Sequence, residues 1–168
     1  PFKIAIEPEP RGTAGAIRFC AEIVELDKTF LVLNGDVLTD LDTSSLIAFH
    51  RQSGGLATIA MQTVENPSRY GVISTSDTGQ VMDFVEKPAL GTEPSNNINA
   101  GTYVMEPGVL EGIPTDTVVS IERETFPQLA ANGELYAMSA DSYWLDTGTP
   151  EQFLDCLLYT SPSPRDNS

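Results

Sequence analysis

Residues 30–36 read Phe-Leu-Val-Leu-Asn-Gly-Asp, four apolar residues that run into a glycine and an aspartate. A short continuous apolar run that ends in a turn signal is typical of a strand buried on both faces, as in the sheets of α/β proteins. Ligands of open α/β sheets bind beyond the carboxyl ends of the strands. The run therefore delivers Asp36 to a place where a ligand would bind, although short strands also end in Gly-Asp turns that have no function.

A second segment repeats this pattern near the end of the chain. Residues 143–146, Tyr-Trp-Leu-Asp, end an apolar stretch in an aspartate, and Gly148 follows two positions later. Two aspartates at strand ends could meet in one crevice and share a divalent metal, since Mg²⁺ prefers one or two carboxylates together with phosphate oxygens. Asp36 and Asp146 are thus candidate ligands of Mg²⁺. The alternative is a pair of turn-forming aspartates.

The order of apolar patterns predicts the fold class. The first part of the chain alternates between strand and helix patterns, which indicates an α/β fold with a doubly wound, mostly parallel sheet. The predicted elements are a strand at 2–6, a helix capped by Thr13 and running to Leu26, a strand at 30–36, a helix capped by Asp42 or Thr43, and a strand at 57–64. A hairpin of 71–75 with 80–86, a strand at 97–105 and a helix at 121–131 follow, so the sheet is expected to be mixed.

The composition excludes some classes of partner. The 168 residues include 24 acidic and 9 basic side chains, a formal net charge of −15, which argues against a nucleic acid or an anionic membrane as the partner. Phosphorylated small molecules remain compatible, because local charge sets a binding site. Cys20 and Cys156 fit no metal-ligand spacing, so we interpret them as reduced, which favours a cytoplasmic protein.

The two ends of the chain differ from its middle. Without an initiator methionine, the chain opens on the apolar run Phe2–Ile6, which predicts that an upstream part precedes it. Residues 158–168 switch to a Ser/Pro-rich composition that resembles translated vector sequence; a flexible linker is the alternative. We therefore expect one domain at 1–157 and a non-native tail at 158–168.

Glu86-Lys87-Pro88 follows the second strand of the predicted hairpin. The proline forces an extended exit from the strand, which aims its neighbours out of the sheet. A lysine there is a compact cation suited to a phosphate, and the glutamate suits a sugar hydroxyl. An ordinary exposed ion pair is the alternative.

Two glycine-containing segments are further candidates. Gly12-Thr13-Ala14-Gly15 opens a predicted helix, so its backbone N–H groups could face a nucleotide, although many such loops only start a helix. Asn99 and Gly101 could present an amide and an open backbone to a ligand, or they mark a β-bulge.

Asp40-Leu41-Asp42 requires separate treatment, because a D-x-D motif after a strand is how many glycosyltransferases hold a metal-bound sugar nucleotide. Thr43 follows directly, which also makes the motif a good helix cap, and we favour the cap. His50 has no Ser or Cys partner at a recognisable nucleophile site, so we interpret it as a histidine on the surface of a helix. Trp144 is either a core residue or the wall of a nucleotide or sugar pocket.

Taken together, six short segments in order resemble the sugar-phosphate nucleotidyltransferases over nearly everything from Phe2 to about Leu157. The segments are Gly12–Gly15, Leu33–Asp36, Tyr70–Val72, Phe84–Pro88, Asn96–Tyr103 and Tyr143–Thr149. Within that family, Gly12–Gly15 and Ser120–Pro127 are most similar to the mannose-1-phosphate guanylyltransferases, and the glucose-1-phosphate thymidylyltransferases are near relatives.

The resemblance implies a Rossmann-like three-layer nucleotidyltransferase fold. It also implies that a sugar 1-phosphate oxygen attacks the α-phosphate of a nucleoside triphosphate, so that pyrophosphate leaves and a nucleotide sugar forms. GTP and mannose 1-phosphate are the expected substrates, with Mg²⁺ as the cofactor. The implied roles are metal binding for Asp36 and Asp146, contact with the sugar phosphate for Lys87, and contact with sugar hydroxyls for Glu86 and Asn99. Gly71 would offer backbone contact, Gly12 and Thr13 would lie by the base, and Gly101 is a further candidate for substrate binding.

Two departures from the family pattern affect this expectation. The family's opening glycine-rich loop, with the Arg and Lys that bind the triphosphate, is absent from these 168 residues, so we expect the chain by itself to be inactive. The family also usually has an apolar residue where Arg11 stands. A non-catalytic regulatory subunit of the same fold and a metal-dependent glycosyltransferase remain alternatives, and the oligomeric state, including a homo-oligomer, stays open.

Overall fold

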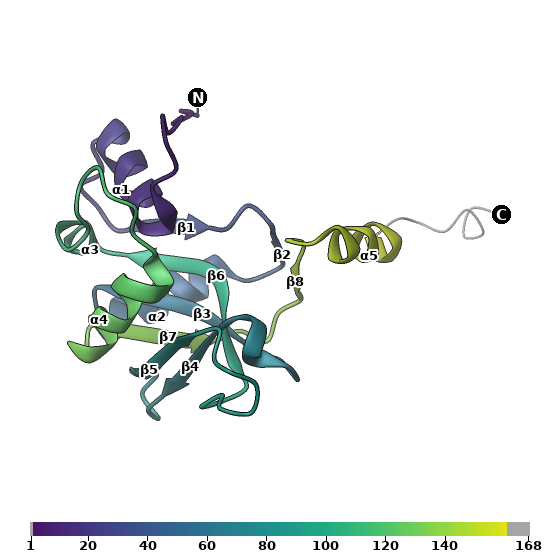
Figure 1. Cartoon of the computed structure of the whole chain (residues 1–168). Coiled ribbons are helices and arrows are strands. Elements are labelled where there is room, and N and C mark those ends of the chain that lie inside the picture. The colour runs from purple at the N-terminus through teal and green to yellow at the C-terminus, as the bar shows by residue number, and fades with distance from the viewer. Residues whose placement is uncertain (1, 161–168) are drawn as a thin grey trace.

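The computed structural model describes residues 2–160. Strands and helices share the chain, as the alternating pattern predicts (Figure 1). The strands are β1 (Phe30–Leu33), β2 (Val37–Thr39), β3 (Ala57–Thr63), β4 (Gly71–Thr75), β5 (Val81–Glu86), β6 (Asn97–Met105), β7 (Leu135–Ser139) and β8 (Trp144–Asp146). The helices are α1 (Gly12–Val24), α2 (Thr43–Ser53), α3 (Gly108–Glu111), α4 (Phe126–Ala131) and α5 (Pro150–Thr160), with the single turns η1 (Pro67–Arg69) and η2 (Ile121–Thr125).

The main sheet has the strand order β5-β4-β6-β3-β7, and β1 pairs with the second half of β6. Strand β6 is antiparallel to β1, β3 and β4, and β4 is antiparallel to β5; within residues 2–160 the parallel pairing is that of β3 with β7. The prediction of a mixed α/β sheet is confirmed, but the prediction that it is mostly parallel is wrong. Strands β1 and β3 do run in the same direction, as a crossover through α2 requires, but β6 lies between them and makes each local pairing antiparallel.

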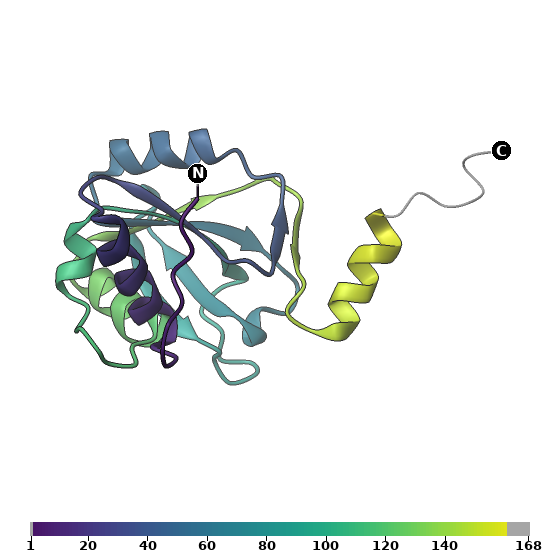
Figure 2. The same cartoon turned by 90° about the horizontal axis from the view of Figure 1, so that it is seen from above.

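Helices cover both faces of the sheet, which gives the expected three layers (Figure 2). The larger core lies on the side of α1, α3 and α4, where Tyr103 and Phe84 pack against the ring of Phe126 with centroids 5.1 and 5.3 Å away. The smaller core joins Leu46 of α2 to Ala100 and other apolar residues of the opposite face. Burial of these apolar surfaces is the main favourable term in folding.

The helix ends follow two different rules. Asp42 accepts a hydrogen bond from the backbone N–H of Ser44 at 2.9 Å, so the predicted cap of α2 is confirmed. Gly54 ends the helix in the left-handed conformation. Helix α1 has no side-chain cap, and the prediction that Thr13 caps it is wrong. The hydroxyl of Thr13 instead bonds to Glu122, far along the chain.

The segment Phe2–Ile6 forms no strand, contrary to the expectation from its composition. Phe2, Ile4 and Ile6 are 87%, 73% and 81% exposed. An extended segment becomes a strand only when a neighbouring backbone takes up its N–H and C=O groups, and no strand of residues 7–160 pairs with it.

At the other end, α5 extends away from the body of the molecule in both views (Figures 1 and 2). The expected tail begins inside this helix, and residues 161–168 lie outside the described residues. None of the helices in residues 2–160 combines the length and the apolar character that a membrane span requires.

Candidate active site

Asp36 and Asp146 are brought together by the small β2–β8 sheet. Asp146 pairs with Val37, the residue after Asp36, and the backbone and hydroxyl of Thr147 donate to the carbonyl oxygen of Asp36 at 2.8 and 2.7 Å. A Cβ placed on Gly148 would stand 2.9 Å from Oδ1 of Asp146 and 3.5 Å from Oδ2 of Asp36. Both carboxylates therefore border the same small space, and the missing side chain of Gly148 keeps it open.

The chemistry of this pair fits a magnesium ion. Asp36 is exposed and Asp146 half-buried, and Oδ1 of Asp146 accepts a hydrogen bond from the backbone N–H of Gly148 at 2.8 Å, which orients that carboxylate. No cluster of three or more His, Cys, Asp and Glu side chains suited to a metal occurs in residues 2–160. Two carboxylates are enough for Mg²⁺ when substrate phosphates supply further oxygens.

A bulge in the middle of β6 lies beside the end of β1, close to Asp36 in the chain. The register between β3 and β6 shifts between Ile59 and Met61, and Gly101, on the opposite strand, has a φ of 75°. A Cβ on Gly101 would stand 2.9 Å from Nδ2 of Asn34, and the backbone N–H of Asn34 donates to the carbonyl of Gly101 at 2.9 Å. Gly101 thus marks a bulge, and the close contact with Asn34 fixes the end of β1 just before Asp36.

Asn99 is oriented by the same bulge. Its Oδ1 accepts from the backbone N–H of Gly101 at 2.9 Å, and its Nδ2 donates to the hydroxyl of Tyr103 at 2.9 Å. Burial raises the pKa of Tyr103, and the charge of Glu122 adds to the rise. A sugar contact by Asn99 stays a prediction.

Glu86 is the last residue of β5 and Lys87 follows it, but the prediction that Pro88 forces an extended exit is wrong, because the backbone of Lys87 is left-handed. Lys87 adopts a φ of 49°, its side chain is 61% exposed, and its Nζ lies 3.7 Å from Oε1 of Glu86. Burial raises the pKa of Glu86, and the nearby charge of Glu122 raises it further, while Lys87 and Arg123 act in the opposite direction. Glu86 is therefore a partly buried carboxylate with a cation beside it. Such a group is a candidate for contact with a polar ligand.

Gly71 lies opposite Glu86 in the β4–β5 pairing. A Cβ on Gly71 would stand 2.6 Å from the ring of Phe84 and 3.0 Å from Oε2 of Glu86, so a larger residue would displace the carboxylate. The role of Gly71 seen here is to give Glu86 room, and the backbone contact with a substrate stays a prediction.

The predicted base loop is tied to a distant segment. The backbone N–H groups of Ala14 and Gly15 donate to the carbonyl oxygen of Val119 at 3.0 and 3.4 Å, so the expectation that these two groups face a nucleotide is wrong. Gly12, with a φ of 72°, would place a Cβ 2.5 Å from the same oxygen. Gly12 is required for this contact, and Thr13 lies beside it at the start of α1.

Arg11, the departure from the family pattern, has partners of its own. Its Nη2 lies 2.9 Å from Oδ1 of Asp116, and its guanidinium lies 4.7 Å from the centre of the Phe19 ring. The side chain is 20% exposed, so Arg11 fastens the loop to α1 and to residues 116–119.

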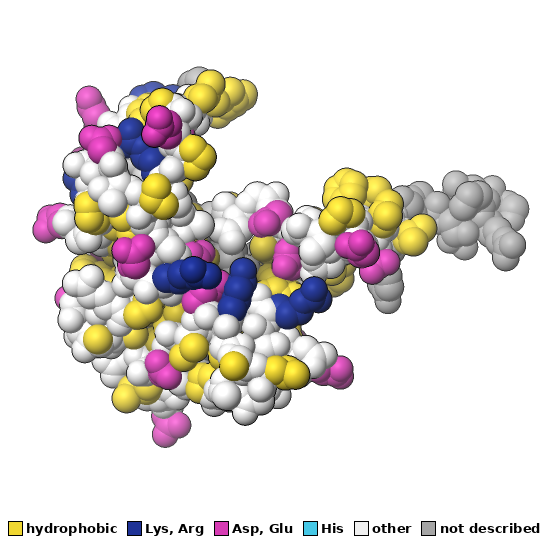
Figure 3. All heavy atoms as spheres, in the orientation of Figure 1, with side chains coloured by type: hydrophobic (Ala, Val, Ile, Leu, Met, Phe, Trp, Pro, Cys, Tyr) yellow, Lys and Arg dark blue, Asp and Glu magenta, His cyan; other side chains and the backbone are white. Residues whose placement is uncertain are grey.

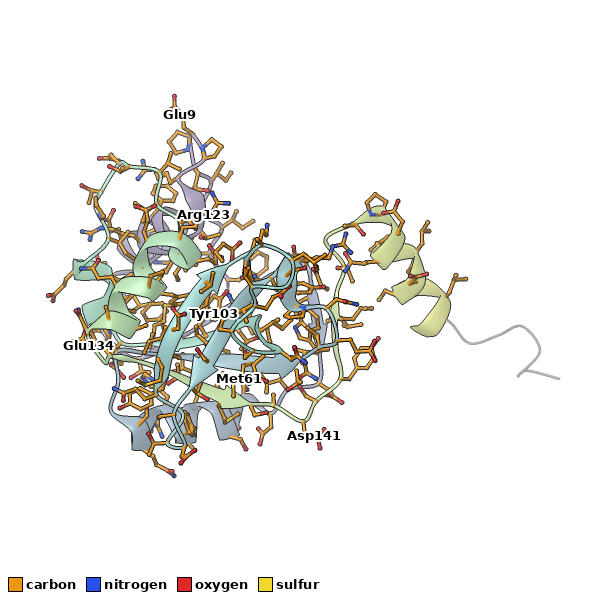
Figure 4. All side chains as sticks on the ribbon, turned by 60° about the horizontal axis from the view of Figure 1, so that its bottom comes forward. Glu9, Met61, Tyr103, Arg123, Glu134 and Asp141 are labelled. Atoms are coloured by element: carbon orange, nitrogen blue, oxygen red, sulfur yellow. The ribbon has the colours of Figure 1, made fainter. Side chains whose placement is uncertain are left out.

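Aromatic and basic side chains border the site. Trp144 donates from Nε1 to the carbonyl of Ala100 at 2.9 Å, and its ring meets that of Tyr70 edge-on, with centroids 5.6 Å apart. Figure 3 shows Lys and Arg side chains gathered in the hollow between the α1 side of the molecule and the β4–β5 side. Acidic side chains lie beside these cations in the same view, so the hollow contains charges of both signs. In Figure 4, Arg123, in the middle of η2, lies above Tyr103 on β6.

Glu122 is the residue that the sequence did not single out by itself. Its Oε2 accepts hydrogen bonds from the hydroxyls of Thr13 and Ser120 at 2.8 and 2.9 Å. The only sequence signal was the similarity of Ser120–Pro127 to the guanylyltransferase branch of the family, which gives no role to any single side chain.

The aspartates of the alternative D-x-D motif are occupied by their own neighbourhood. Oδ1 of Asp40 accepts from the backbone N–H of Tyr143 at 2.7 Å, and Oδ2 of Asp42 accepts from the hydroxyl of Ser45 at 2.6 Å. His50 is buried rather than on the helix surface, between Thr58 at 2.8 Å and Glu106 at 3.1 Å.

Comparison with known proteins agrees with this geometry. The family model described as "Nucleotidyl transferase" matches residues 1–161. The chain belongs to this family. The β2–β8 sheet and the Glu86-Lys87 segment lie within the matched residues.

Relatives within the family point to one branch of it. A mannose-1-phosphate guanylyltransferase catalytic subunit beta of Dictyostelium discoideum is 41% identical over 150 residues, 88% of this chain and 41% of the relative. A mannose-1-phosphate guanyltransferase of Yarrowia lipolytica is 43% identical over 165 residues, 96% of this chain and 45% of the relative. The chain thus spans less than half the length of these curated relatives.

Solved nucleotidyl transferase structures share the fold. The crystal structure of HddC from Yersinia pseudotuberculosis complexed with GMP-PN superposes with a TM-score of 0.75 at 29% sequence identity, and the match covers 93% of this chain and 65% of that one. The expected α/β nucleotidyltransferase fold is confirmed.

Proposed function

We propose that the protein transfers a guanylyl group from GTP to mannose 1-phosphate, releasing pyrophosphate and forming a nucleotide sugar. The observation that supports this most strongly is the convergence of Asp36 and Asp146 beside Gly148, in a chain of the nucleotidyl transferase family. The named relatives support guanine and mannose as the base and the sugar.

The proposed reaction depends on charge and position. Nucleotidyl transfer needs alignment of the attacking oxygen and neutralisation of the phosphates more than it needs a protein nucleophile. Asp36 and Asp146 would hold Mg²⁺, which supplies positive charge at the α-phosphate. Lys87 would contact the phosphate of the sugar, and its exposed position at the strand exit leaves the ammonium free to do so.

The remaining roles are proposed for the residues that surround this pair. Glu86, Asn99 and Gly101 would bind the sugar, and Gly71 would keep space for Glu86 and offer its backbone. Gly12 and Thr13 would lie by the base. We also infer that the protein works in the cytoplasm, as a reaction that consumes GTP and a metal-bound phosphate suggests, and that no nucleic acid or membrane takes part. A homo-oligomer is compatible with this function but is not part of it.

A substrate panel tests the proposal. The protein, as encoded in full, is incubated with Mg²⁺ and each pair of GTP or dTTP with mannose 1-phosphate or glucose 1-phosphate, and pyrophosphate release is measured. We expect the highest rate with GTP and mannose 1-phosphate. Turnover with dTTP and glucose 1-phosphate but not with GTP would overturn the proposed base and sugar. Turnover with none of the pairs would overturn the proposal that the protein is an enzyme of this kind.

A further inference from the structure

Glu122 connects two segments that are far apart in the sequence. Thr13 donates its hydroxyl proton to Oε2 of Glu122 at 2.8 Å, and the two residues are 109 positions apart. The same hydroxyl oxygen accepts from the backbone N–H of Ile121 at 2.8 Å. The side chain of Thr13 is therefore held in one orientation through both its donor and its acceptor.

The backbone around this contact is fastened separately. The N–H of Val119 donates to the carbonyl of Arg11 at 2.9 Å, and the carbonyl of Val119 accepts from the N–H of Ala14 at 3.0 Å. These bonds hold the two segments together without Glu122. The bond between Thr13 and Glu122 therefore adds side-chain orientation to a connection that the backbone already makes.

The charge of Glu122 also acts on Glu86. After burial, its charge is the next cause that raises the pKa of Glu86, and it contributes to the raised pKa of the Tyr103 hydroxyl. Lys87 and Arg123 are the cations that act on Glu86 in the opposite sense. Glu122 thus contacts the start of α1 directly and acts on Glu86 through its charge.

We propose that Glu122 is a positioning residue for nucleotidyl transfer, which holds Thr13 in the orientation that binds the nucleotide. The inference rests on the proposed function, since that function supplies the two ligands. The physical reason is that a hydrogen bond to a charged group is stronger than one between neutral groups, so Glu122 limits the rotamers of Thr13 before the substrate arrives.

A purely structural role predicts something different. Ser120 also donates to Oε2 of Glu122, at 2.9 Å, and its hydroxyl accepts from the backbone N–H of Arg123 at 3.2 Å, which caps η2. If Glu122 only supported this cap, its removal would lower the melting temperature and would weaken the binding of both substrates equally.

The chain offers a matched control for removal of the charge. Glu124 lies in the same turn, is exposed, and accepts from the backbone N–H of Ser120 at 3.0 Å. Glu124→Gln and Glu122→Gln remove the same charge from neighbouring positions, but only Glu122 bonds to Thr13.

The experiment uses the protein as encoded in full, with Glu122→Gln, Thr13→Val, Thr13→Ser, Glu124→Gln and the double variant of Thr13→Val with Glu122→Gln. The affinity for a non-hydrolysable GTP analogue is measured without turnover. KM, kcat and the pH profile for mannose 1-phosphate are measured beside it, and the melting temperature reports on folding.

We expect Glu122→Gln and Thr13→Val each to lower the affinity for the analogue by about tenfold, the range of one charge-assisted hydrogen bond. The double variant should be no weaker than the weaker single variant, because both changes break the same contact. Thr13→Ser should recover most of the affinity lost in Thr13→Val. Glu124→Gln should bind the analogue as the wild type does.

The pH profile tests whether the charge of Glu122 affects Glu86. Loss of the Glu122 charge lowers the pKa of Glu86, so the acidic limb for mannose 1-phosphate should move to lower pH in Glu122→Gln and move less in Glu124→Gln. The inference is wrong if the wild type is active and Glu122→Gln matches Glu124→Gln, or if the losses in the double variant add. A wild type that binds no guanine nucleotide overturns the proposed function and this inference with it.

Discussion

Two pairs of aspartates lie at opposite ends of the small β2–β8 sheet, yet their surroundings differ. Asp36 and Asp146 turn carboxylate oxygens toward the space beside Gly148. Asp40 and Asp42 direct theirs to the backbone N–H groups of nearby residues at 2.7 and 2.9 Å. Both carboxylate oxygens of Asp42 accept hydrogen bonds at the start of α2. Asp36 and Asp146 instead converge on one space, and Asp146 accepts a backbone hydrogen bond through Oδ1. The comparison shows that a D-x-D spacing alone does not identify a metal site.

The largest expected effect is on the Gly148 pair. Asp36→Asn or Asp146→Asn keeps the shape of the side chain but removes charge that would hold Mg²⁺ against the triphosphate. We expect kcat to fall by roughly 10²-fold or more, since electrostatic contacts in transfer sites have this magnitude. Steady-state pyrophosphate release measures the loss, and an unchanged melting temperature shows that the fold is intact. Full activity in either variant would place the metal elsewhere.

The next effect concerns Lys87, the cation proposed to contact the sugar phosphate. Lys87→Ala removes the ammonium group, and the side chain is 61% exposed, so the fold should tolerate the change. We expect KM for the sugar phosphate to rise by about 10-fold to 100-fold, the range of one hydrogen bond between charged groups. Substrate titration measures it. A rise in the KM for GTP instead would move Lys87 to the other substrate.

Glu86→Gln should have opposite effects on binding and stability. We expect KM for the sugar phosphate to rise by about tenfold as one charge-assisted hydrogen bond weakens. Because the pKa of Glu86 is raised in the folded state above its usual 4.5, its ionised form destabilises the fold at pH values above that raised pKa. The variant should therefore melt slightly higher than the wild type at neutral pH, and the difference should vanish below pH 4.5. Equal melting temperatures at all pH values would contradict the burial of this carboxylate.

The smallest effect on chemistry is expected at Asp42. Its hydrogen bonds to Ser44 and Ser45 lower its pKa, chiefly through the hydroxyl of Ser45, so the stability it contributes is present above its unfolded pKa of about 3.8 and is lost as the pH falls through the lower folded value. Asp42→Asn should lower the melting temperature at neutral pH and change kcat by less than about twofold, because a cap acts on the helix alone. Thermal melts and rate measurements separate the two effects. A large loss of kcat would favour the D-x-D reading.

The sequence predicts the first aspartate pair because its signals are local. Each strand and its terminal aspartate are contiguous in the chain, and the strand-end rule then brings Asp36 and Asp146 to one edge. The cap at Asp42 is predictable for the same reason, since the partner of the side chain is two residues away.

Other features depend on contacts that no local pattern encodes. The insertion of β6 between β1 and β3 decides that the sheet is mainly antiparallel, and each strand looks the same in sequence whichever neighbour it has. Thr13 has the sequence signature of a cap, but Glu122, from another segment, takes its hydroxyl. Glu122 itself lies in a π-helical turn that breaks the helical period, so its position facing the base loop could not be predicted.

The most direct test compares the two aspartate pairs in one experiment. Asp36→Asn with Asp146→Asn, and Asp40→Asn with Asp42→Asn, each remove two negative charges from the same part of the fold. Pyrophosphate release from GTP and mannose 1-phosphate is followed across a Mg²⁺ titration for both double variants and the wild type. The account predicts no magnesium-dependent rate in the first double variant and a wild-type magnesium curve in the second. A magnesium-dependent rate that survives in the first and is lost in the second would contradict it.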